Sequence, residues 1–162
     1  MRLTAAEWVA SLPALGEVLY LRGPAECPVR AGLSHGVLVE SAELAPLLQT
    51  RALAAAGAIT QDGPREWIEC MSDGGRVVAR LYLLPDTDYL AWDALQVGAG
   101  PAWEEPTRVS STSWRPVSAR LLRFRVRRLA GMQLLGAEAG IGASSLGRDL
   151  AARIARDEVL SR

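Results

Sequence analysis

The chain has 162 residues, of which 49% are hydrophobic and 22% charged, and this composition excludes a disordered protein. Its 18 acidic residues balance its 18 basic residues, which argues against the net-basic class of nucleic-acid-binding domains. No apolar run reaches the roughly 18 residues of a membrane helix, so we expect no membrane span. Every basic residue is arginine, and neither Lys nor Asn occurs. This bias is typical of a GC-rich genome, and we expect a bacterial one.

The first 23 residues predict a helix followed by a strand. Thr4 and Glu7 have the spacing of a capping box, which favours a helix over residues 4–12. The segment EVLYLRG that follows Gly16 alternates in the manner of a strand. Acidic residues and Pro13 interrupt the apolar core that a secretory signal needs, so we expect a cytoplasmic protein.

The next segment predicts a loop and a second helix. Residues 23–36 hold five Gly or Pro residues without periodicity, which is typical of a loop. Ser41 can cap a helix that runs through Ala56, with Gly57 as its stop and Pro46 disturbing its first turn.

The central third predicts three strands joined by tight turns. The segments AITQ, REWIECMS and RVVARLYLL are separated by Asp-Gly sequences, which favour hairpin turns. Alternation divides the last two segments into two faces. The apolar face holds Ile68, Cys70, Val77, Ala79, Leu81 and Leu83, and the mixed face holds Trp67, Glu69, Arg80 and Tyr82.

The last part predicts three helices. Asp86 or Thr87 can cap a short one that packs through Tyr89, Leu90 and Ala94, and residues 97–115 follow as a loop. Residues 116–135 favour a helix that begins at Pro116, although the stretch LRFRVR also alternates like a strand. Ser144 or Ser145 can cap a final helix that ends at Leu160, with Leu146, Leu150 and Ile154 on one face. Gly140-Ile141-Gly142 before it resembles a phosphate-binding glycine turn, but we interpret it as a helix-entry turn.

These elements predict an α+β fold. We expect a single domain over residues 1–162, with a small antiparallel sheet of three to four strands and helices packed on one face.

The charge is unevenly distributed along the chain. Residues 1–105 hold 14 acids and 7 arginines, whereas residues 106–162 hold 4 acids and 11 arginines. If residues 116–135 are helical, Arg120, Arg123 and Arg127 share a face that can bind an acidic partner or an anionic ligand. The alternative is that acids of the same chain, namely Asp86, Asp88, Asp93, Glu104 or Glu105, neutralise these arginines.

Several aromatic residues gather in the same region. Tyr89, Trp92, Trp103 and Trp114 fall in and after the short helix, and aromatic side chains on loop-rich surfaces are favoured in binding sites. The alternative is that they cover the open face of the sheet. We hypothesise that they form, with the three arginines, a site for a protein partner or an anionic small molecule.

Cys27 and Pro28 form a dipeptide that resembles the short Cys-Pro motif of heme-regulated proteins. The resemblance covers two residues and implies that the Cys27 thiolate is a heme-iron ligand. His35, the single histidine of the chain, lies in the same loop and is the matching second ligand. The alternative is that Pro28 only shapes the loop.

Catalytic signals are weak. One histidine and two cysteines, Cys27 and Cys70, match no zinc spacing, and no G-x-S-x-G elbow is present. The sequence therefore favours a non-catalytic cytoplasmic accessory or regulatory protein that binds a protein partner or an anionic small ligand. A heme or tetrapyrrole carrier or sensor is the second hypothesis, and an enzyme with an unrecognised site is the third.

Overall fold

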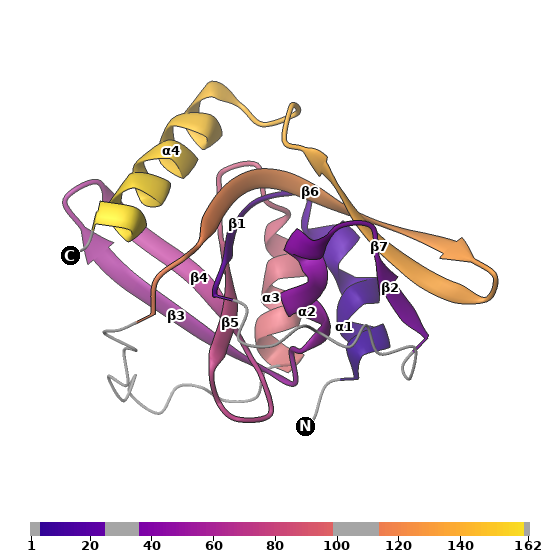
Figure 1. The fold of residues 1–162 in the computed structure, drawn as a ribbon. Coiled ribbons are helices and arrows are strands. Elements are labelled where there is room, and N and C mark those ends of the chain that lie inside the picture. Colours follow the sequence, from indigo (N-terminus) through magenta and orange to yellow (C-terminus); the bar gives the residue numbers. More distant parts are fainter. Residues whose placement is uncertain (1–3, 25–35, 99–113, 161–162) are drawn as a thin grey trace.

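A computed structural model describes residues 4–24, 36–98 and 114–160. These residues form a seven-stranded sheet in the order β2-β7-β6-β1-β5-β4-β3 (Figure 1). The strands are β1 (Glu17–Arg22), β2 (Val37–Val39), β3 (Ala52–Thr60), β4 (Gly63–Met71), β5 (Val77–Tyr82), β6 (Ser118–Leu129) and β7 (Met132–Ala139). The helices are α1 (Ala5–Ser11), α2 (Ala45–Leu48), α3 (Tyr89–Gly98) and α4 (Ser145–Leu160), with 3₁₀ turns η1 (Leu12–Leu15) and η3 (Ala42–Leu44).

The prediction of a small antiparallel sheet with helices on one face is wrong, although the fold is of the α+β kind. The sheet is mixed, because β2 runs parallel to β7 while the other described pairs are antiparallel. It is also larger than expected, because two segments that the sequence predicts as helices are strands. Helices cover both faces: α1, α2 and α3 lie on one side, and α4 lies on the other (Figure 1).

Strand β1 is central, and both of its faces are buried. Val18 and Tyr20 belong to the main core, which α1, α2 and α3 cover. Leu19 and Leu21 point to the opposite face and pack against Ile154 of α4. The near-continuous apolar sequence VLYL therefore indicates a strand covered on both sides rather than one with a solvent face.

The predicted first helix is confirmed. Thr4 and Glu7 form the capping box, with the Glu7 amide donating to the Thr4 hydroxyl at 3.3 Å and the Thr4 amide donating to the Glu7 carboxylate at 3.2 Å. Trp8 and Val9 of this helix are fully buried in the main core.

The central strands are also confirmed, together with their two faces. Ile68 lies opposite Leu81 and Cys70 opposite Ala79, all within the main core. On the other face, Trp67 lies opposite Tyr82, and Glu69 lies opposite Arg80. Alternation identifies these faces because β4 and β5 pair antiparallel in register over most of their length. The prediction fails at Val77, because the register shifts at Cys70 and Met71 and Val78 packs against the main core instead.

The predicted helix from Ser41 to Ala56 is wrong in its second half. Helix α2 ends at Leu48, and the alanine-rich segment that follows is β3. Alanine favours a helix intrinsically, but β3 pairs with β4 along its whole length, and this pairing outweighs the local preference. Gly57 lies within the strand, where a Cβ atom would approach the Arg65 carbonyl oxygen to 3.2 Å.

The predicted helix over residues 116–135 is wrong, and the strand alternative is correct. Strands β6 and β7 form a hairpin whose turn residues Ala130 and Gly131 have φ of 49° and 79°. Positive φ at both central residues matches the twist of antiparallel strands. Leu122 and Phe124 alternate into the main core, so Arg123 and Arg127 project from one face of β6 and Arg120 from the other.

A buried arginine fixes α4 on the sheet. The Arg80 guanidinium pairs with Glu69 at 2.8 Å and with Glu158 of α4 at 3.2 Å. It lies over the Trp114 ring, 4.4 Å from its centroid, and the Tyr82 hydroxyl donates to Glu158. Burial, followed by the hydrogen bond to Glu158, raises the pKa of Tyr82, so this hydroxyl stays a donor.

The last helix begins as predicted. The Ser144 hydroxyl accepts from the Gly147 amide at 3.1 Å, and Ile154 is buried. Leu146, in contrast, is exposed. Within the described ranges, no helix has the length and apolar character needed to cross a membrane.

The buried hairpin face predicts the cost of truncating its side chains. Leu81→Ala leaves a cavity in the main core and should lower the free energy of unfolding by about 2–4 kcal/mol. Leu129→Ala, on an exposed side chain of β6, should change it by less than about 0.5 kcal/mol. Chemical denaturation of both variants tests this. Equal effects of the two substitutions would contradict the assignment of the core face.

Candidate functional site

The three predicted arginines lie in ion pairs with glutamates of the same chain. Arg120 pairs with Glu43 at 2.6 Å, Arg123 with Glu17 at 3.8 Å, and Arg127 with Glu40. None of these glutamates is among the acids that the sequence singled out as neutralising partners. The strand geometry also separates Arg120 from the other two arginines, so they do not form one shared face.

Glu40 forms ion pairs with two arginines of β6. Its carboxylate binds Arg125 at 2.8 Å and also binds Arg127, while Arg125 reaches Glu138 at 3.2 Å. The hydrogen bonds from Arg125 and then Arg127 lower the pKa of Glu40 from its ordinary value of 4.5. These ion pairs join the end of β2 to the β6–β7 hairpin.

The predicted aromatic residues do not gather at one place. Trp92 is buried in the main core, and Tyr89 is exposed at the start of α3. Trp114 packs on Arg80, and its indole nitrogen donates to the Val77 carbonyl at 2.8 Å. Trp103 lies outside the described residues. The binding role of this set stays a prediction.

The predicted heme ligands Cys27 and His35 also lie outside the described residues, so that hypothesis stays a prediction. Cys70 lies on the buried face of β4, and this burial raises the pKa of its thiol to about 12. A thiol with that pKa is protonated at neutral pH and is a poor nucleophile or metal ligand. In residues 4–24, 36–98 and 114–160, no group of three or more His, Cys, Asp or Glu side chains could hold a metal ion.

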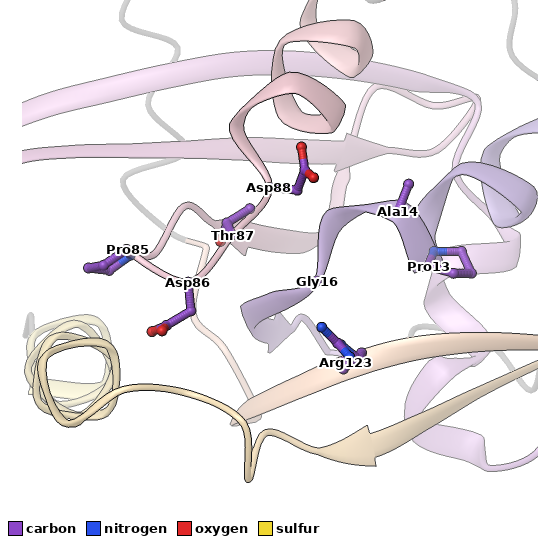
Figure 2. A pocket seen from close by; sticks show the side chains of 8 residues that line it. All are labelled: Pro13, Ala14, Gly16, Pro85, Asp86, Thr87, Asp88 and Arg123. Atoms are coloured by element: carbon purple, nitrogen blue, oxygen red, sulfur yellow. The ribbon is translucent and has the colours of Figure 1, made fainter.

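A surface pocket of about 450 Å³, here the Arg123 pocket, lies between η1, the loop before α3, and β6 (Figure 2). It is lined by Pro13, Ala14, Gly16, Pro85, Asp86, Thr87, Asp88 and Arg123.

Backbone contacts and Thr87 make the pocket wall rigid. Gly16 bridges to Thr87, and the Asp88 amide donates to the Leu15 carbonyl at 2.8 Å. The buried Thr87 hydroxyl donates to the Glu17 carbonyl at 2.6 Å and accepts from the Leu84 amide at 2.9 Å. Gly16 has φ of 70°, and a Cβ atom there would lie 3.3 Å from the Asp86 carbonyl oxygen. Glycine therefore suits this position both for its backbone conformation and for the close approach.

The two aspartates of the pocket each bind the start of a helix, Asp88 as the N-cap of α3 and Asp86 through the N-cap residue of α4. Asp86 accepts from the Ser144 amide at 3.0 Å and from the Ser144 hydroxyl at 2.9 Å, at the start of α4. Asp88 accepts from the Ala91 amide at 2.9 Å and is the N-cap of α3, a role that the sequence gave to Asp86 or Thr87. The N-terminus of α4 thus already has a carboxylate from its own chain.

Glu17 adds a third carboxylate next to the pocket. It is 5% exposed, and among the described residues its Oε2 atom has no hydrogen-bond partner. Gly140 and Gly142 lie over it, since Cβ atoms there would approach its carboxylate oxygens to 2.8 and 2.9 Å. These glycines therefore enclose a carboxylate of the same chain. The phosphate-binding role that their resemblance suggested does not fit this position, because a phosphate would meet a negative charge.

The balance of charge favours a cation in this pocket. Asp86 and Asp88 line the pocket with the guanidinium of Arg123, and the buried Glu17 carboxylate lies 3.8 Å from that guanidinium. Each helix N-terminus contributes only about half a positive charge, so the two helices do not reverse the sign. The nearest counter-ion of Arg123 is 3.8 Å away, and its side chain is 57% exposed, so it can move aside.

Exposed apolar side chains lie within a few residues of two segments that the Arg123 pocket brings together. Tyr89 and Leu90 follow Asp88 directly, and Leu90 is 83% exposed. Ile141 and Leu146 lie on either side of Ser144, and Ile141 is 84% exposed. The hydrogen bonds between Asp86 and Ser144 join these two segments, and the four exposed side chains are here called the apolar rim.

Sequence reasoning missed most of this site. Asp86 and Thr87 were interpreted as capping residues, and Asp86 and Asp88 as acids that neutralise arginines of the same chain. The sequence offered one usable signal, the pair of glycines around Ile141, which indicates a close approach without showing that Glu17 is the group approached.

No known protein family matches the chain, and a search of curated proteins finds no match.

The lowered pKa of Glu40 predicts a pH-dependent contribution to stability. Because its pKa is lower in the folded than in the unfolded chain, its contribution is present above about pH 4.5 and is lost as the pH falls through the folded value. Glu40→Gln should therefore lower the melting temperature at pH 7, and this difference should shrink below pH 4.5. Thermal melts from pH 7 to pH 3 measure it. A difference that stays constant with pH would show that the ionised carboxylate is not the stabilising group.

Proposed function

We propose that this chain is a non-catalytic, cytoplasmic binding protein that recognises a protein partner through the Arg123 pocket and its apolar rim. The observation that carries the proposal is that four exposed apolar side chains belong to the two segments that Asp86 and Ser144 join at the pocket. Protein interfaces combine such apolar contacts with a few placed polar groups.

The charge of the pocket defines the kind of side chain that it accepts. An Arg or Lys of the partner can reach Asp86 and Asp88, whose capping bonds leave further lone pairs on each carboxylate. An acidic side chain would meet the carboxylates of Asp86 and Asp88, with only Arg123 to receive it and with that guanidinium already near the buried Glu17. We therefore favour a protein partner with a cationic anchor over an anionic small ligand.

The rigidity of the pocket supports binding without rearrangement. The bridge from Gly16 to Thr87 and the bonds from Asp86 to Ser144 fix its walls before any partner arrives. Preorganised sites lose less conformational entropy on binding.

The proposal predicts two variants that fold normally and lose the partner. A photo-crosslinking residue at Leu146 should capture the partner from the host cell, and the purified partner then allows affinities to be measured. Asp88→Asn keeps a good helix cap but removes a charge, so it should weaken binding about tenfold with the melting temperature unchanged. Leu146→Ser should weaken binding by a similar factor.

Val159→Ser is the matched control, because Val159 is also an exposed apolar residue of α4 but lies near its other end. It should leave the affinity unchanged. A partner that binds the Asp88→Asn and Leu146→Ser variants as tightly as the wild type would contradict the proposed site.

A further inference from the structure

The two edges of the sheet differ in how they are protected. β2 is an edge of three residues. β3, at the other edge, has nine residues, ALAAAGAIT, with no charged residue and no proline. Short edges, charges and prolines are the usual devices that prevent edge-to-edge pairing, and β3 has none of them.

Within the described residues, strand β3 is paired on one side. Among the described strands, β4 is its single neighbour, and alternate residues of an edge strand direct their N–H and C=O groups away from the sheet. Ala58 and Ile59 are exposed, and Ile59, at 91%, is the most exposed large apolar residue in the described part of the chain.

We propose that β3 pairs antiparallel with β3 of a second copy of this chain, centred on Ala56, to form a two-fold symmetric dimer with a continuous sheet. This inference goes beyond the proposed partner site, which lies at a different part of the fold.

The sequence of β3 is complementary to itself in this register. Pairing about Ala56 places residue 53 opposite residue 59, so Ile59 of one copy lies against Leu53 of the other on the same face of the sheet. Leu53 is 8% exposed and belongs to the main core, so this contact extends the core of each copy and covers Ile59. Two-fold symmetry makes the contact twice.

The remaining positions fit the same register. The residues between Leu53 and Ile59 are alanine and glycine, which leave no bulky side chain to separate the two strands. Just beyond each end, Arg51 of one copy comes next to Gln61 and Asp62 of the other. The present ion pairs of these residues are long: Arg51 lies 3.9 Å from Asp73, and Asp62 lies 3.5 Å from Arg65 and 3.7 Å from Arg153. Arg51 also donates to the Leu48 and Thr50 carbonyls through one guanidinium nitrogen, which leaves its other nitrogens for an opposite charge.

Sedimentation of the full chain tests the dimer. The wild type should pass from monomer to dimer as its concentration rises to about 100 µM. Ile59→Lys places a charge against Leu53 and should raise the dissociation constant at least about tenfold. Leu129→Lys, on an exposed apolar residue of the β6–β7 hairpin, is the control and should dimerise like the wild type.

Disulfide trapping tests the register. In a chain with Cys27→Ser, Ala56→Cys should crosslink to itself, because residues directly opposite are about 4.5–5.5 Å apart at Cα, within disulfide range. Ala54→Cys should not crosslink to itself, since the two copies of residue 54 would lie about 14 Å apart. A monomer at all concentrations, a dimer insensitive to Ile59→Lys, or equal crosslinking at residues 54 and 56 would each overturn the proposal.

Discussion

The packing of α4 on the sheet depends on the ion pairs of the buried Arg80 guanidinium. It joins β4 through Glu69 and α4 through Glu158, and it stacks on Trp114 at the approach to β6. A buried charge is costly without partners, and each partner here comes from a different segment. The sheet therefore has one favourable position for α4, which Arg65 reinforces through Asp157 at 2.7 Å. In this position α4 covers Leu19 and Leu21 of β1, which would otherwise be exposed to solvent on the second face of the sheet.

The Arg123 pocket follows from the same docking. With α4 fixed, Ser144 reaches Asp86, and the loop over Gly140 and Gly142 encloses Glu17. The pocket wall and the apolar rim are thus held by a helix whose far end is anchored by Arg80. The arginines of β6 contribute less positive charge to a binding surface than their number implies, because glutamates of β1, the end of β2 and η3 neutralise them. Charge in this chain mainly joins its own segments.

Local patterns predicted the parts of the fold that local forces determine. The capping box at Thr4, the strand of β1, the hairpin faces around Ile68 and Arg80, and the start of α4 were all visible in the sequence. The first part of β3 was assigned to a helix and β6 was assigned to a helix over its strand alternative, because their composition suits a helix. In the structure, pairing with β4 across a tight turn and with β1 far away in the sequence overrules that preference. The pocket was missed for the same reason, since Asp86 meets Ser144 across 58 positions of sequence.

Hydrogen exchange of the Arg80→Met variant tests the central claim most directly. Methionine keeps the length and the apolar packing of the side chain but leaves Glu69 and Glu158 without their cation. The amides of α4 should then exchange at least about tenfold faster, while the β6–β7 hairpin keeps its protection. Arg128→Met, on an exposed arginine of β6, should leave α4 unchanged. An α4 that exchanges at the wild-type rate in folded Arg80→Met protein would contradict the view that this guanidinium holds the helix on the sheet.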